Sequence, residues 1–388
     1  MQNPFEYGRE LGPGELADRQ VEVGEVRDAL LGGAKYFLIG PRRYGKSSVH
    51  NVAAELARKR GAVVLRYNVE AFGTIDPLLA AIVADTARLL KGPVRRVGAR
   101  LAELFRALRP ELTYHPLDHS WSVGLEAAAA ERAVPRLVEV LDGLERAAAS
   151  AGRPVGLVLD EIQHLVAGGV EAERQLRAAV QQHRHVGYVF AGSDTRLLAA
   201  MTSDPARPFY RLGDVRVLQE IPSPEFIAFL AAGFARLPAK VDAIALTTLL
   251  DEAEEVPYNV QLLAHQCWSA LRDEGKGAVL DAGRVREVHR AAARRMDPVY
   301  SQSWLALTAP QRRALQALAT EGGIGLFGAA TAHRYLLPAS AMKKALDALV
   351  TKRIARRESR GNADRLRLED PLFGLWVRES VEPVRTPE

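Results

Sequence analysis

Over the first 220 residues, short apolar runs alternate with longer stretches of helical periodicity. The apolar runs are rich in valine, leucine, isoleucine and aromatic residues, which favours buried strands. Strands that alternate with helices form parallel sheets covered on both faces, so the pattern predicts an α/β fold with a three-layer αβα core. The predicted strands cover residues 36–39, 62–69, 155–159, 186–191 and 215–218, and the predicted helices cover 16–31, 48–57, 74–109, 127–151 and 171–183.

The pattern changes after residue 220. Every segment from 225 to about 296 has helical periodicity, which predicts a small helical lid rather than more sheet. A proline-rich stretch at 221–225 and the pair Asp297-Pro298 mark two domain boundaries. We therefore expect an αβα core at residues 1–220, a helical lid at 221–298 and a third domain at 299–388.

The third domain has the pattern of a winged helix. Helices are predicted at 310–320, 329–335 and 339–352, and a charged two-stranded hairpin follows with its tip at 359–364. Basic residues cluster on the third helix and the hairpin, as on a surface that contacts the phosphates of double-stranded DNA. A winged helix that docks on a partner protein, with its arginines merely solvated, is the alternative. The candidate DNA contacts are Lys343, Lys344, Arg356, Arg357 and Arg360.

The most specific chemical signal lies between the first predicted strand and the helix that follows it. The sequence there matches the phosphate-loop pattern G-x-x-x-x-G-K-[ST]. Its glycines allow a tight turn, and the N–H groups at the helix start face a bound anion. We expect ATP here, with Lys46 on the β- and γ-phosphates and the Ser47 hydroxyl on Mg²⁺. The expected nucleotide-binding residues are Gly40, Pro41, Arg42, Arg43, Tyr44, Gly45, Lys46, Ser47 and Ser48.

Two carboxylates follow the apolar run at 155–159. The carboxyl ends of parallel strands form the ligand edge of a sheet, so this pair is expected to face the phosphate loop. Asp160 is the expected Mg²⁺ ligand, through water, and Glu161 is the expected general base for the attacking water. An acidic pair in this position is also typical of a helix cap, and the phosphate loop upstream favours the nucleotide site.

Further polar residues follow the next apolar run. Ser193 is expected beside the γ-phosphate if its strand neighbours the acidic one, although a turn-forming serine gives the same pattern. Arg207 and Arg211 lie in a loop rich in proline and glycine before the last strand. Either arginine could stabilise phosphoryl charge, in a multimer from a neighbouring subunit, or could pair with a local acid such as Asp214.

Composition excludes several classes of protein. The chain has 388 residues, of which 48% are hydrophobic and 26% charged, as in a folded protein of two or three domains. Cys267 is the only cysteine, which excludes a disulfide framework and is expected to be a buried thiol. No long uncharged apolar run or signal segment is present, so we expect a cytoplasmic protein without membrane contact. The net charge of +5 permits contact with nucleic acid without requiring it.

The histidines do not form an evident metal site. His115 and His119 are separated by a proline in a predicted hairpin at 112–125, so we expect loop histidines rather than ligands on one helix face. His183 and His185 follow a polar helix and are expected on the surface.

Five stretches of this chain occur together in a known group of proteins. They are the phosphate loop at 40–47, the Asp-Glu-x-Gln strand end at 160–163, Gly-Ser at 192–193, Pro-Phe-Tyr-Arg at 208–211 and the Asp-Pro-x-Phe-x-x-Trp tail at 370–376. Together they resemble the prokaryotic "archaeal ATPase" group of P-loop ATPases, which is related to the AAA+ and STAND classes and to origin-recognition proteins. The resemblance covers nearly the whole chain and implies a P-loop core, a helical lid, a winged helix, ATP and Mg²⁺.

The resemblance also bears on single residues. It makes Arg211 a better arginine-finger candidate than Arg207. The segment Glu255-Val256-Pro257 keeps the proline of the lid motif Gly-x-Pro, which implies that Pro257 contacts the nucleotide, but it lacks the glycine. Ser47 stands where threonine is commoner, a change without consequence for Mg²⁺.

The sequence thus predicts an ATP-driven molecular switch. Binding of ATP between the loop and the lid would reposition the winged helix and couple nucleotide state to DNA or partner binding. Hydrolysis is expected to be slow unless a nucleotide-dependent homo-oligomer supplies Arg211 from a neighbouring subunit. The alternative is a nucleotide-stabilised DNA-binding or protein-docking regulator with negligible turnover. A kinase is less consistent with the sequence, because no acceptor site is evident.

Overall fold

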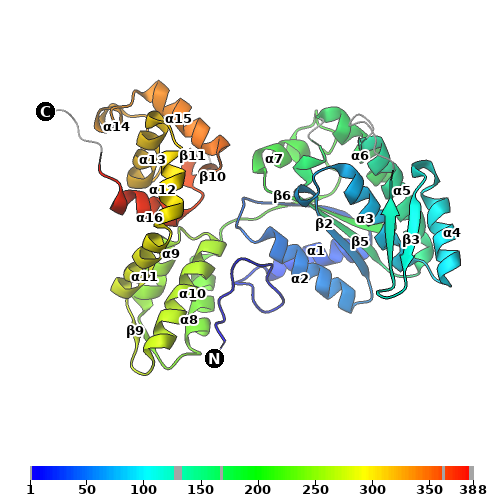
Figure 1. The fold of residues 1–388 in the computed structure, drawn as a ribbon, viewed down its shortest axis with the longest axis horizontal. Coiled ribbons are helices and arrows are strands. Elements are labelled where there is room, and N and C mark those ends of the chain that lie inside the picture. The colour runs from blue at the N-terminus through cyan, green and yellow to red at the C-terminus, as the bar shows by residue number, and fades with distance from the viewer. Residues whose placement is uncertain (1, 126–132, 167–168, 361–362, 384–388) are drawn as a thin grey trace. The chain divides into compact units, whose positions relative to one another are not determined.

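Two compact units make up the chain in the computed structural model (Figure 1). The structure describes all residues except 1, 126–132, 167–168, 361–362 and 384–388. One unit is formed by Gly8–Glu220, and the other by Ile221–Glu388 together with the N-terminal Met1–Tyr7. Within the described residues, every helix is too short or too polar to cross a membrane.

The unit at Gly8–Glu220 is built on a five-stranded parallel sheet with the strand order β2-β5-β6-β1-β7. The residues of β5 and β6 are buried along the whole of each strand, as expected for central strands covered on both faces. Strand β6 lies between β1 and β5, so the loops that follow these three strands meet at one edge. The strands are β1 (Lys35–Ile39), β2 (Val63–Asn68), β5 (Val155–Asp160), β6 (Val186–Gly192) and β7 (Asp214–Val217).

Helices cover both faces of this sheet, which confirms the predicted αβα layers (Figure 1). Alternate side chains of β1 enter different cores: Phe37 and Ile39 enter one, and Tyr36 and Leu38 the other. The helices α1 (Gln20–Gly32) and α2 (Lys46–Lys59) pack on the second core. On the first core pack α3 (Ile75–Thr86), α4 (Val94–Leu104), α5 (Ala133–Ala151), α6 (Val170–Gln182) and α7 (Thr195–Ser203).

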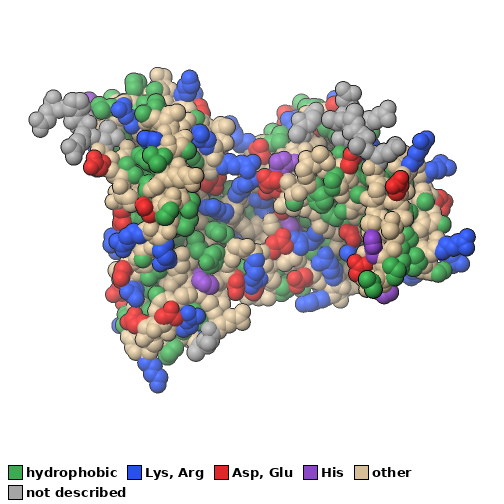
Figure 2. All heavy atoms as spheres, in the orientation of Figure 1, with side chains coloured by type: hydrophobic (Ala, Val, Ile, Leu, Met, Phe, Trp, Pro, Cys, Tyr) green, Lys and Arg blue, Asp and Glu red, His purple; other side chains and the backbone are tan. Residues whose placement is uncertain are grey.

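The predicted hairpin after α4 is present. Strands β3 (Glu111–His115) and β4 (Ser120–Gly124) pair in antiparallel register, and a Cβ atom on Gly98 of α4 would lie 2.9 Å from the Trp121 ring. The hairpin therefore packs closely on α4. Figure 2 shows Lys and Arg side chains gathered over this helix. The exposed basic residues there are Lys91, Arg95, Arg96 and Arg100.

The other unit begins with four helices in the places predicted for the lid. A short parallel pair of strands, β8 (Lys240–Val241) and β9 (Val279–Leu280), lies among them, and the helical periodicity did not predict it. The N-terminal segment belongs here, because Phe5 packs against Phe234 with ring centroids 4.8 Å apart. The helices are α8 (Ser223–Phe234), α9 (Ala243–Glu252), α10 (Pro257–Glu274) and α11 (Ala282–Arg295).

The remaining residues form three helices and a hairpin in the winged-helix arrangement, flanked by two further helices. Two hydrogen bonds join the flanking helices. The Tyr300 hydroxyl donates to Asp370 over 2.8 Å, and the indole N–H of Trp376 donates to Asp297 over 2.8 Å. The Asp-Pro-x-Phe-x-x-Trp tail is thus a packing element. The elements are α12 (Asp297–Leu305), α13 (Ala309–Glu321), α14 (Ala329–Arg334), α15 (Ala339–Thr351), β10 (Ala355–Arg360), β11 (Ala363–Leu368) and α16 (Pro371–Ser380).

Candidate nucleotide site

The glycine loop joins β1 to α2 and leaves the start of the helix open to an anion. Gly45 caps α2 in a left-handed conformation with φ of 88°, which a residue with a Cβ rarely adopts. Because Gly45 has no side chain, none competes for the first N–H groups of α2. Those groups and the positive end of the helix dipole are the standard elements of a phosphate site.

Lys46 is the first residue of α2 and is 5% exposed. Its Nζ donates a 3.0 Å hydrogen bond to the carbonyl oxygen of Pro41. The side chain therefore bends back across the loop that contains both residues. An ammonium group held there would be near phosphates bound by the loop amides, as the motif predicts.

Asp160 lies beside the loop and faces Ser47. The Ser47 hydroxyl donates a 2.9 Å hydrogen bond to Asp160 Oδ2, although 113 residues separate the two along the chain. The N–H of Glu161 donates to the other carboxylate oxygen over 2.9 Å. Burial on its own raises the pKa of Asp160. The hydrogen bonds from His50 and Ser47 and the charge of Lys46 outweigh this and lower the pKa well below its usual range. Asp160 is therefore an anion at neutral pH.

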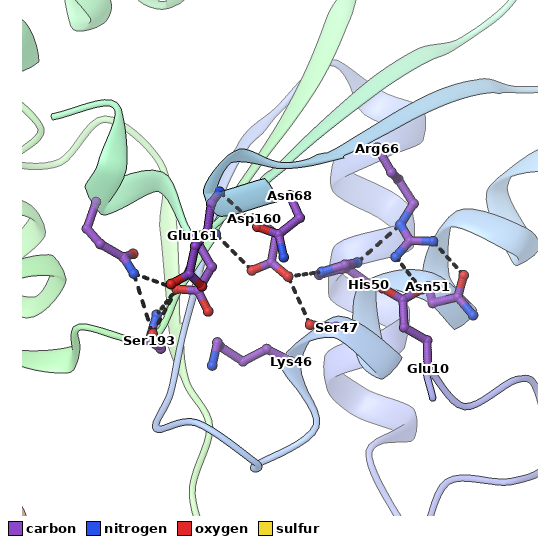
Figure 3. Close-up of polar contacts among 12 residues, drawn as sticks. Glu10, Lys46, Ser47, His50, Asn51, Arg66, Asn68, Asp160, Glu161 and Ser193 are labelled. Atoms are coloured by element: carbon purple, nitrogen blue, oxygen red, sulfur yellow. Dashed lines mark hydrogen bonds and ion pairs between the residues drawn. The ribbon is translucent and has the colours of Figure 1, made fainter. Parts of the chain in front are cut away.

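Glu161 has a left-handed backbone with φ of 56°, and its carboxylate points toward β6 (Figure 3). Its Oε2 accepts a 2.8 Å hydrogen bond from the Ser193 hydroxyl, a 3.1 Å bond from the Ser193 N–H and a third from Gln163 Nε2. Space for the Gln163 amide exists because residue 192 is glycine: a Cβ there would lie 2.4 Å from Gln163 Oε1. The structure thus brings Glu161 and Ser193 together at the edge where the loops after β5 and β6 meet.

Other residues of the loop have internal roles. The Ser48 hydroxyl, which the motif assigned to the nucleotide, accepts a 3.0 Å hydrogen bond from the N–H of Leu11. Arg42 pairs with Glu70 at 3.2 Å on the surface. Arg43 is exposed, whereas Tyr44 is buried in the core, with an exposed fraction of 4%.

Sequence reasoning gave no role to three polar residues around the acids. His50 Nε2 lies 3.0 Å from Asp160 Oδ2, and Arg66 contacts the other ring nitrogen of His50. Asn68 pairs with Asp160 in the register of β2 and β5. The sequence feature that could have identified His50 is its helical spacing, because it lies one turn beyond Lys46 and Ser47 on the same face of α2.

The two candidate arginines differ in their surroundings. Arg207 forms an ion pair with Glu173, a fully buried carboxylate, with Nε and Oε2 3.0 Å apart. Its partner is therefore a distant acid on α6 and not Asp214, and Arg207 has a structural role. Arg211 is exposed, has φ of 55° and places its guanidinium carbon 5.1 Å from the Tyr210 ring centroid. Pro257 begins α10 in the other unit.

The basic surface predicted for the winged helix is smaller than expected. Arg356 is 8% exposed and donates a 2.6 Å hydrogen bond to the Leu368 carbonyl, and Arg357 forms an ion pair with Asp347. The assignment of the buried Arg356 to DNA is therefore wrong, whereas Arg357 keeps an exposed fraction of 30% and its contact with DNA stays a prediction. The side chain of Arg360 lies outside the described residues. Lys343 and Lys344 are exposed on α15, as predicted.

The cysteine and histidine predictions have mixed outcomes. Cys267 is fully buried, as expected, and burial raises the pKa of its thiol to about 12. His183 is buried rather than on the surface, because it bonds the Tyr188 hydroxyl at 2.7 Å and Asp142 at 2.9 Å. His115 and His119 lie on the hairpin, and no group of three potential metal-ligating His, Cys, Asp or Glu residues occurs in the described part of the chain.

Comparison with known proteins identifies the fold of this chain. No family model and no curated protein matches the sequence. Among solved structures, a Walker-type ATPase of Pyrococcus abyssi superposes with a TM-score of 0.59 at 16% identity, over 97% of this chain and 99% of that one. This chain has the fold of a Walker-type ATPase.

Two origin-recognition structures of Aeropyrum pernix show the same similarity. ORC2, in ADPNP and ADP complexes, matches with a TM-score of 0.52 at 14% identity, over 97% of this chain and 98% of that one. ORC1, in complex with DNA, matches with a TM-score of 0.51 at 15% identity, over 95% of each chain. The predicted fold, with its parallel-sheet core and C-terminal winged helix, is therefore confirmed.

Proposed function

We propose that this chain binds and hydrolyses ATP and acts as a nucleotide-dependent switch. The observation that supports this most directly is the hydrogen bond between Ser47 and Asp160. It joins a hydroxyl at the start of the phosphate-loop helix to an anion at the end of β5. Lys46 is buried next to them, and Glu161 lies at the same sheet edge. These are the groups that phosphoryl transfer to water requires.

The residues present fit a magnesium ion. Ser47 Oγ and Asp160 Oδ2 are hard oxygen donors close to each other, and Mg²⁺ prefers few protein oxygens together with waters and phosphate oxygens. When bound, Mg²⁺ would neutralise charge on the β- and γ-phosphates. Lys46 would add a second positive charge at those phosphates, and the N–H groups at the start of α2 would bind their oxygens.

Glu161 is the proposed general base. Its carboxylate would accept a proton from the attacking water, while Ser193 holds the carboxylate and the Gln163 amide fixes its orientation. Arg211, exposed at a left-handed turn, is the proposed arginine finger and would act from a neighbouring subunit of a homo-oligomer. We also propose the domain division at 220 and 298, with Pro257 of the lid at the nucleotide and the winged helix contacting DNA or a partner protein.

Two substitutions test this function. Lys46→Ala should weaken ATP affinity about 10- to 100-fold, since a charge-assisted bond to phosphate is lost. Glu161→Gln should leave affinity nearly unchanged and lower hydrolysis by about 100-fold or more. Lys59→Ala and Glu171→Gln, which change exposed side chains, are matched controls. Unchanged binding in Lys46→Ala would refute the nucleotide site, and unchanged hydrolysis in Glu161→Gln would remove Glu161 from its role.

A second candidate function, a nucleotide-stabilised regulator with negligible turnover, is favoured by one observation. The Oε2 atom of Glu161 already accepts three hydrogen bonds from Ser193 and Gln163, which reduces its capacity to accept a proton from water. Hydrolysis measured at increasing protein concentration, with and without duplex DNA, separates the two functions. ATP binding without turnover under every condition would support the regulator.

A further inference from the structure

His50 lies between the proposed magnesium ligand and an arginine of the neighbouring strand. The imidazole is 2% exposed, and its Nε2 is 3.0 Å from Asp160 Oδ2 (Figure 3). The same carboxylate oxygen accepts the Ser47 hydroxyl. Two side chains of α2, one turn apart, therefore hold one oxygen atom of a carboxylate that comes from β5.

Arg66 determines which nitrogen of His50 carries the hydrogen. Arginine has only donors, and Arg66 Nε lies 3.2 Å from His50 Nδ1, so Nδ1 must accept. The hydrogen of the neutral ring is then on Nε2 and is donated to Asp160. Arg66 is itself fixed, because it donates a 2.6 Å bond to Asn51 and a 2.7 Å bond to Glu10.

We propose that His50 is a positioning residue for Asp160. It would fix the orientation of the carboxylate that binds magnesium with ATP, and Arg66 would select the tautomer that makes this possible. The inference rests on the proposed function, since it assumes that Asp160 binds the metal. Hydrogen-bonded groups behind a metal ligand typically change metal affinity 10- to 100-fold when they are removed. A buried histidine with no such role would alter only the stability of the fold.

The measurement that separates these roles is the magnesium requirement of nucleotide binding. A fluorescent ATP analogue is titrated onto the full chain at a series of Mg²⁺ concentrations and again in EDTA. His50→Ala should raise the half-saturating Mg²⁺ concentration about 10-fold or more, with little change in EDTA. His50→Gln, whose amide Nε2 can donate from nearly the same position, should restore most of the wild-type requirement.

Arg66→Met provides a second test if His50→Ala does not fold. It should shift the Mg²⁺ requirement in the same direction by a smaller factor, because neither tautomer is then selected. Arg58→Met is the control: Arg58 is an exposed arginine near the end of α2 that donates a 2.7 Å hydrogen bond to the Val64 carbonyl. Arg58→Met should leave the Mg²⁺ requirement unchanged.

The outcomes of these experiments are distinguishable. Wild-type protein that binds no nucleotide, or binds it equally well in EDTA, would refute the proposed metal–nucleotide site. Wild-type protein with a clear Mg²⁺ requirement that is unchanged in His50→Ala, or not restored by His50→Gln, would overturn the positioning role alone. Equal shifts in Arg66→Met and Arg58→Met would also overturn it.

Discussion

The hydroxyl of Ser193 donates a 2.8 Å hydrogen bond to the carboxylate of Glu161. These two residues follow adjacent parallel strands, and their contact joins the proposed general base to the strand that lies between the phosphate loop and the acidic pair. The carboxylate of Glu161 is oriented by this bond together with those from the Ser193 N–H and the Gln163 amide.

Ser193→Ala should therefore impair catalysis more than binding. The substitution removes one of the hydrogen bonds that orient Glu161, and we expect hydrolysis to fall about 10-fold while ATP affinity changes less than about threefold. Steady-state hydrolysis and equilibrium binding measure the two quantities. Ser203→Ala, which removes an exposed hydroxyl at the end of α7, is the control. An equal loss of affinity would place Ser193 on the nucleotide instead.

The proposed role of Arg211 predicts an effect between subunits. Arg211→Ala should lower hydrolysis by about 100-fold or more and should remove the rise of specific activity with protein concentration. Mixing Arg211→Ala with Glu161→Gln should restore part of the activity, because a Glu161→Gln subunit supplies the arginine and an Arg211→Ala subunit supplies the base. Arg196→Ala, an exposed arginine of α7, is the control. Activity that is independent of concentration and not restored by mixing would contradict action in trans.

The 3.0 Å hydrogen bond between Glu252 and His289 predicts a pH dependence of stability in the other unit. The hydrogen bond from His289 lowers the pKa of Glu252 from its ordinary value of 4.5, against the opposing effect of burial, and the charge of Arg286 adds to the lowering. A group whose pKa falls on folding contributes stability above its ordinary pKa and loses it as the pH falls through the lowered value. The contribution of Glu252 should therefore be present above its ordinary pKa of 4.5 and be lost as the pH falls through the lowered value.

Glu252→Gln tests this dependence. The substitution should reduce the free energy of unfolding by about 1 kcal/mol at pH 7, and the difference from the wild type should narrow as the pH falls below 4.5. Urea unfolding between pH 3 and pH 7 measures it. Glu287→Gln changes an exposed glutamate of α11 and should give a smaller difference. A difference that stays constant on acidification would show that packing, and not charge, accounts for the effect.

Local sequence predicted the parts of the site that follow from single strands and loops. The phosphate loop and the acidic pair were identified because each depends on one apolar run and the residues after it. The contact of His50 with Asp160 was not predictable in this way, since it depends on how α2 packs over β5. The partner of Arg207 was not predictable for the same reason, because Glu173 lies 34 residues away on α6.

The fold shows the same division between local and long-range information. The five sheet strands were found from hydrophobic runs, whereas the two-residue strands β8 and β9 are too short to give a periodicity. The positive charge of the cluster that contains Arg356 and Arg357 was evident from the sequence. The partner of Arg356, the Leu368 carbonyl, depends on the pairing of β10 with β11, and the partner of Arg357, Asp347, depends on the packing of α15. Charge in a sequence therefore did not indicate which arginines remain on the surface.

The exposed lysines of α15 provide the test of DNA contact by the winged helix. If Lys343 and Lys344 each neutralise one phosphate, Lys343→Glu/Lys344→Glu should weaken binding to duplex DNA. It should also reduce the slope of log affinity against log salt concentration by about 2, because roughly one counterion is released per phosphate contact. Fluorescence anisotropy with a labelled duplex at several salt concentrations measures both quantities.

The control for this test is a charge reversal of equal size on the other unit. Arg95 and Arg96 are exposed on α4, and the structure shows no ion pair for either among the described residues. Arg95→Glu/Arg96→Glu should leave the affinity and salt slope close to wild type if the winged helix makes the contact. The opposite result, with loss of binding only on α4, would move the DNA-binding surface to the αβα unit. Equal small losses in both variants would indicate a non-specific electrostatic effect, because the two variants change the net charge of the protein by the same amount.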